Sequence, residues 1–158
     1  MTAEQQFESF LRKYDPAVAT EAKKVLAKLR QLVPNAVEMV YDNYNALVVG
    51  FCPGMRPSEA ILSIALMPRW ITLCFLQGRG LPDPGKRLRG DGNIVRSVRL
   101  ESGAKTLDEP DIRALIGEAL QRAKVPIPGC QQRQFLIKSV SAKQRPRRPA
   151  DSKRSRKK

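Results

Sequence analysis

The sequence predicts an α+β domain in which a mostly antiparallel sheet of four or five strands is flanked by N-terminal and C-terminal helices. Three observations support this fold class. Apolar residues recur at helical spacing near both ends of the folded part of the chain, strand-like segments lie between them, and turn residues bound each segment. The 158 residues suffice for one domain, which at this length buries roughly 70% of its unfolded surface.

The two longer predicted helices each begin at an acidic residue close to a proline. Asp15 and Pro16 match an N-cap and a first helical position, and apolar residues then recur at helical spacing up to Pro34. A similar start, Asp108-Glu109-Pro110-Asp111, precedes a second helix that is predicted to end before Pro126. A shorter helix is predicted over 4–13, with three of its apolar side chains facing inward.

Between the helices the sequence pattern changes to that of strands. Four segments are rich in β-branched, aliphatic and aromatic residues, and a fifth is a further candidate; they are 46–51, 60–67, 70–76 and 94–100, with 133–140 as the fifth. Met67, Pro68 and Arg69 are predicted to form the hairpin turn between the second and third of them.

Positive charge is concentrated at the C-terminus. The chain carries 29 Lys and Arg against 15 Asp and Glu, a net charge of +14, and residues 138–158 hold ten of the basic residues and a single acid. From Ala142 onward there is no large apolar residue, so little surface can be buried to offset the entropy of ordering. The predicted organisation is a domain over 1–141 followed by a disordered basic tail over 142–158.

Several functional classes are excluded or disfavoured by composition. The absence of histidine excludes Ser-His-Asp and Cys-His catalysis and any zinc site with an imidazole ligand. The three cysteines fit a reducing compartment, the N-terminus does not resemble a signal peptide, and the apolar stretch 60–76 is interrupted by Pro68 and Arg69. We therefore expect a cytoplasmic protein without a membrane partner, and we assign no cofactor, metal ligand or catalytic residue. An enzyme stays an alternative, which without histidine would need Cys52, Tyr41 or a paired carboxylate.

Polar and aromatic residues gather at the junction between the second helix and the first strand. With two residues from later strands they give a candidate ligand-binding site of Glu38, Tyr41, Asp42, Tyr44, Trp70 and Arg96. Arg96 shares its strand parity with apolar residues, so it either pairs with an acid such as Glu38 or Asp42 or lies next to a bulge. Two alternatives remain: a turn in which Asp42 and Asn43 bond their own backbone, and a surface arginine.

An ordered set of short motifs over 4–124 resembles the YdhG-like family of domains of unknown function. The motifs include Glu38 to Tyr44, Leu66 to Trp70, Leu81 to Pro84, Gly92-Asn93, Arg96 and the helix 107–123. The resemblance implies a compact α+β domain with an antiparallel sheet. Some relatives are described as frataxin-like iron chaperones, which would require exposed carboxylates. The acids here are scattered and 1–137 is net positive, so no metal ligand is carried over.

Three functions are therefore predicted as alternatives. The first is a non-catalytic domain that binds an unknown small ligand at the six residues above or serves as a scaffold. The second is non-specific binding of nucleic acid or another polyanion, because basic runs bind phosphates by counterion release. Its residues are Lys143, Arg145, Arg147, Arg148, Lys153, Arg154, Arg156, Lys157 and Lys158. The third is the frataxin-like iron chaperone.

Overall fold

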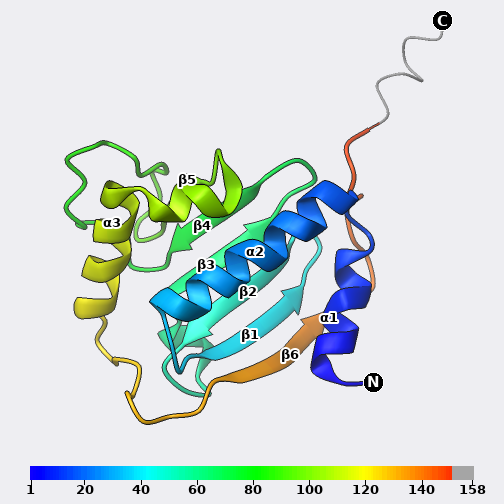
Figure 1. Cartoon of the computed structure of the whole chain (residues 1–158), viewed down its shortest axis with the longest axis horizontal. Helices are drawn as coiled ribbons and strands as arrows, with labels where there is room; N and C mark the ends of the chain where they lie inside the picture. The colour runs from blue at the N-terminus through cyan, green and yellow to red at the C-terminus, as the bar shows by residue number, and fades with distance from the viewer. Residues whose placement is uncertain (151–158) are drawn as a thin grey trace, which may run out of the picture.

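A six-stranded mixed sheet is the centre of the computed structural model, which describes residues 1–150 (Figure 1). The strand order is β5-β4-β3-β2-β1-β6. The strands are β1 (Val37–Asp42), β2 (Leu47–Cys52), β3 (Leu62–Leu66), β4 (Ile71–Phe75), β5 (Arg96–Arg99) and β6 (Gln134–Val140). β1 to β5 pair in antiparallel succession, whereas β6 pairs parallel to β1.

The predicted α+β class and the mostly antiparallel pairing are confirmed, and the predicted count of four or five strands is corrected to six. The strand that was not predicted is β1, because residues 37–42 were interpreted as a junction before the first strand. The segment 133–140 does form the predicted fifth strand, now β6, and it lies at the outer side of β1. Parallel pairing requires a long crossover connection. The chain provides it between β5 and β6, through helix α3 (Pro110–Gln121) and the irregular segment 122–133.

The helices begin where the sequence pattern indicates. Besides α3 they are α1 (Ala3–Leu11) and α2 (Pro16–Leu32), with two short 3-10 helices, η1 (Pro57–Glu59) and η2 (Gly103–Asp108). Thr2 caps α1 through a reciprocal pair of hydrogen bonds with Gln5. Pro16 and Pro110 occupy the first turns of α2 and α3, where a missing N–H leaves no intrahelical bond unmade.

The helices bury one face of the sheet. Figure 1 shows α2 lying along the sheet, and the main core combines apolar residues of α1, α2 and α3 with those of all six strands. On β1 the alternation puts Glu38, Val40 and Asp42 on this helical face and Val37, Met39 and Tyr41 on the other. The smaller cluster on that other face contains no residue of α1, α2 or α3. Two carboxylates therefore lie under the helices.

Residues 141–150, called the C-terminal strap below, cross the end of the sheet in contact with it. The backbone N–H of Ser141 donates to the Asp42 carbonyl at 2.8 Å, that of Arg145 donates to the Tyr44 carbonyl at 2.8 Å, and Arg147 is only 5% exposed. The predicted disorder is therefore wrong for 142–150, because a buried arginine supplies the contacts that apolar residues would otherwise make. Residues 151–158 lie outside the described residues.

Over residues 1–150, no helix combines the length and the apolar character needed to cross a lipid bilayer.

Candidate nucleic-acid interface

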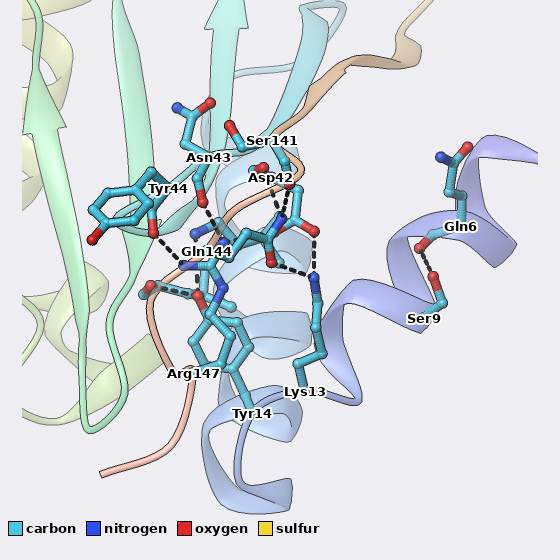
Figure 2. Close-up of polar contacts among 12 residues, drawn as sticks. Gln6, Ser9, Lys13, Tyr14, Asp42, Asn43, Tyr44, Ser141, Gln144 and Arg147 are labelled. Atoms are coloured by element: carbon cyan, nitrogen blue, oxygen red, sulfur yellow. Dashed lines mark hydrogen bonds and ion pairs between the residues drawn. The ribbon is translucent and has the colours of Figure 1, made fainter. Parts of the chain in front are cut away.

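Asp42, the last residue of β1, is a fully buried carboxylate between two cations. Lys13 Nζ lies 2.5 Å from its Oδ2, and Arg147 Nη2 lies 2.8 Å from its Oδ1 (Figure 2). Burial acts to raise the pKa of Asp42, but the hydrogen bonds from Lys13, Gln144 and Arg147 outweigh it and hold the pKa below its usual value. Asp42 is therefore ionised at neutral pH and serves as the attachment point of the strap.

Arg147 binds the turn between β1 and β2 as well as the carboxylate. Its Nη2 also donates to the Asn43 carbonyl at 2.5 Å, and its Nη1 donates to the Tyr44 carbonyl at 3.4 Å. Its Nε is buried and has no hydrogen-bond partner within the described chain. The prediction that Arg147 contacts nucleic acid is corrected, because a guanidinium enclosed in this way is not accessible to a phosphate. Its role is to fix the strap.

Gln144 adds a second attachment of the strap. Its Nε2 donates to the backbone carbonyls of Asp42 and Ser141, each at 3.1 Å, and its Oε1 accepts from Lys13 Nζ at 2.7 Å. Figure 2 shows Lys13, Asp42, Gln144 and Arg147 converging from three separate parts of the chain. The strap therefore has a defined position relative to the end of the sheet.

Tyr14, which was not among the predicted site residues, stabilises the same end of the sheet. Its Oη donates to the Leu66 carbonyl at 2.7 Å and accepts from the Leu47 N–H at 3.1 Å. Burial raises the pKa of Tyr14 above its usual value. The only sequence signal is an aromatic residue in the short link between two amphipathic helices.

A groove of about 730 Å³ lies beside the strap, between the β1–β2 and β3–β4 turns. Its lining includes Tyr44, Met67, Pro68, Lys143 and Arg145. Tyr44 is 47% exposed, and the Arg145 guanidinium lies 5.7 Å from the centroid of its ring. An exposed aromatic face flanked by cations is the combination that single-stranded nucleic-acid binding proteins use.

The six residues predicted to form a ligand site do not line one cavity. Glu38 is fully buried under α2, where Arg30 binds it with contacts of 2.8 and 3.0 Å and Arg133 lies at 3.2 Å. Tyr41 lies on the opposite face of the sheet, and its Oη donates to the Met39 sulfur at 3.7 Å. Burial raises the pKa of Tyr41. Of the six, only Asp42 and Tyr44 lie beside the strap.

The other two members of that set lie toward the β5 side of the sheet. Arg96 starts β5 and donates to the backbone carbonyls of Gly92 and Val95, at 2.7 and 2.9 Å. It pairs with neither Glu38 nor Asp42, and four strand spacings, or about 19 Å, separate β5 from β1. Trp70 ends the β3–β4 turn, and the Arg99 guanidinium lies 3.7 Å from its ring centroid.

The described part of the chain remains strongly basic without the last eight residues. Residues 1–150 carry 24 Lys and Arg against 14 Asp and Glu, a formal charge of +10. Many of the cations are paired with carboxylates, but Lys143 and Arg145 have no ion pair within 1–150. Positive charge extends along the strap from Lys143 to Arg148. Arg148 is exposed, and its guanidinium lies 3.5 Å from the Asp15 carboxylate.

Metal and thiol chemistry find no support in the described residues. Within residues 1–150, no three Cys, Asp or Glu side chains are grouped as they would need to be to hold a metal ion. Cys52 is buried, and burial raises the pKa of its thiol to about 11. Cys74 is half-buried with a raised pKa for the same reason, and Cys130 is exposed.

Comparisons of this chain with protein-family models, with curated proteins and with solved structures gave no match. The resemblance to the YdhG-like family therefore stays a prediction.

Proposed function

We propose that this protein binds nucleic acid through its C-terminal strap and the groove beside it. The observation that carries the proposal is the buried Arg147–Asp42 ion pair, which holds the strap so that Lys143 and Arg145 flank an exposed Tyr44 ring. Cations in fixed positions bind phosphates by releasing counterions, and an exposed aromatic ring stacks on a base without regard to its identity.

The rest of the C-terminal positive charge comes directly after the strap in the sequence. By sequence, residues 151–158 hold five Lys and Arg and one Asp, so a further charge of +4 begins where the strap ends. These residues include Lys153, Arg154, Arg156, Lys157 and Lys158, which were predicted as phosphate contacts. We propose that they add electrostatic affinity while the strap and groove set where the polyanion lies. A small-ligand function at the six predicted residues lacks a shared cavity and is not proposed.

The test measures binding of a fluorescent single-stranded oligonucleotide to the full chain by anisotropy, over a series of salt concentrations. The test variant is Lys143→Gln with Arg145→Gln. The matched control is Lys24→Gln with Lys124→Gln, which removes the same charge from two exposed positions outside the groove. For a single strand each phosphate contact contributes about 0.7 to the log-log salt slope, so losing two contacts should lower it by about 1.4.

The proposal predicts a smaller salt slope and weaker binding for the strap variant than for the control. A third variant, with all five basic residues of 151–158 replaced by Gln, measures the contribution of the remaining charge. Equal slopes for the strap variant and the control would show that the phosphates bind elsewhere. Absence of binding by the unmodified chain at low salt would refute the function itself.

A further inference from the structure

Two further hollows continue the groove across the end of the sheet. The next one, of about 610 Å³, is lined by Arg69, Trp70 and Arg99 among others, and a third, of about 520 Å³, is lined by Lys86, Arg89 and Arg99. The β3–β4 turn joins the first two, because Met67 and Pro68 line the groove and Arg69 and Trp70 line its neighbour. Arg99 lies between the second and the third.

The strand register explains why these hollows are neighbours. Asp42 pairs with Leu47, Leu47 with Leu66 and Leu66 with Ile71, so the β1–β2 turn and the β3–β4 turn lie at the same end of the sheet. Arg99 pairs with Thr72 at that end of β5. At about 4.8 Å per strand, the path from Tyr44 to β5 is roughly 17 Å long.

Cations line this path with few acids to neutralise them. Within residues 1–150, Arg69, Lys86 and Arg89 make no ion pair with a carboxylate, and all three are exposed. The acids lining the two further hollows are Glu101, which borders both, and Glu21, whose carboxylate accepts from the Ala104 N–H at 2.7 Å.

The far end of the path is held by backbone pairing. Arg89 forms an isolated antiparallel bridge with Ser97, and the two backbone hydrogen bonds between them are 2.8 and 2.9 Å long. This bridge fixes the position of Arg89 beside β5. Arg87 is the exception among the basic residues there, because Glu109 and Asp111 both bind its guanidinium. Arg89 and Lys86, with Arg99 stacked on Trp70, are therefore the cations there that no carboxylate of the described chain pairs with.

We infer that the groove and the two hollows form one track that holds a single strand of nucleic acid. Tyr44 and Trp70 lie along the track as the surfaces on which bases stack, and Lys143, Arg145, Arg69 and Arg89 contact phosphates. Aromatic rings can stack on bases only where these are unpaired, which selects a single strand over a duplex. At about 3.4 Å per stacked nucleotide, 17 Å accommodates about five nucleotides. This inference rests on the proposed function and adds to it the class of ligand, a single strand, and the length of strand that the track holds.

The experiment compares the full chain with two variants that leave the strap untouched. Arg69→Gln with Arg89→Gln removes two unpaired cations of the far part of the track, and Trp70→Leu removes its aromatic face. Lys24→Gln with Lys124→Gln is again the charge-matched control. Each protein is titrated against a labelled single strand of about twelve nucleotides and the duplex of the same sequence, and thermal unfolding is measured for each.

The track predicts that the single strand binds more tightly than the duplex at equal salt. The arginine pair should lower the single-strand salt slope by about 1.4, and Trp70→Leu should weaken single-strand binding about five-fold or more. Unchanged binding by the arginine pair, whose exposed side chains do not support the core, would overturn the track while the proposed function stands. Equal or tighter duplex binding would overturn it as well. If the unmodified chain binds neither form, both proposals fail.

Discussion

Replacing Arg147 with alanine should destabilise the protein by much more than its sequence position suggests. The change removes the 2.8 Å contact to Asp42 and the hydrogen bonds to the Asn43 and Tyr44 carbonyls. Removing one member of a buried ion pair costs roughly 3–5 kcal/mol when the other charge is left alone. Here Lys13 remains 2.5 Å from Asp42, and the unpartnered Nε of Arg147 disappears with the side chain. We therefore expect a loss of about 2–3 kcal/mol.

The assay is urea unfolding followed by circular dichroism, with Arg148→Ala as the matched control. Arg148 is the next residue, but it is exposed and its ion pair with Asp15 is 3.5 Å long, so its loss should cost no more than about 1 kcal/mol. For Arg147→Ala the expected loss corresponds to a fall in Tm of about 5–10 °C. Equal midpoints for the two variants would refute the assignment of Arg147 as the anchor of the strap.

Three further predictions concern buried titratable groups. The pKa of Asp42 is lower in the folded state, so its ionisation stabilises the folded protein fully above its unfolded pKa of about 4. This stabilisation is lost as pH falls below that value. In urea titrations at several pH values, Asp42→Asn should therefore reduce the loss of stability in acid. Tyr14→Phe should cost about 1–3 kcal/mol in the same assay, because two buried backbone groups lose their partner; a cost below about 0.5 kcal/mol would contradict the role given to its hydroxyl. At pH 8 a thiol reagent should modify exposed Cys130 well before Cys52, whose pKa is about 11, and peptide mass spectrometry would reveal a reversed order.

Most local elements could be predicted from the sequence because local signals determine them, but β1 was missed because Glu38 and Asp42 interrupt its apolar pattern. Asp15-Pro16 locates the start of α2, and the turn at 67–69 is confirmed by the 2.8 Å bond from the Met67 N–H to the Trp70 carbonyl. The position of β6 could not be predicted, because the hydrophobic pattern of 133–140 indicates a strand but not which neighbour it joins or in which direction. The neighbour and direction of β6 depend on the path by which α3 and the segment after it lead the chain back to β1.

The strap was missed because its stability does not come from apolar surface. Arguments from composition treat Lys and Arg as exposed, and they are rarely fully buried unless paired. The acidic partner of Arg147 could nevertheless have been identified from the sequence. Glu38 and Asp42 share the parity of Val40, so recognising 37–42 as a strand would have placed two carboxylates on the face that Val40 directs to the core. Each then needs a cation, but spacing alone does not indicate that Arg30 and Arg147 supply them.

The most direct test of the account is to map where a bound single strand lies. The full chain would be cross-linked by light to an oligonucleotide containing thiouridine, and the modified peptides would be identified by mass spectrometry. We predict cross-links in the peptides that contain Tyr44, the 67–70 turn and residues 143–148, because these border the groove and its continuation. Cross-links confined to α2, α3 or residues 151–158 would contradict the claim that the end of the sheet is the binding surface.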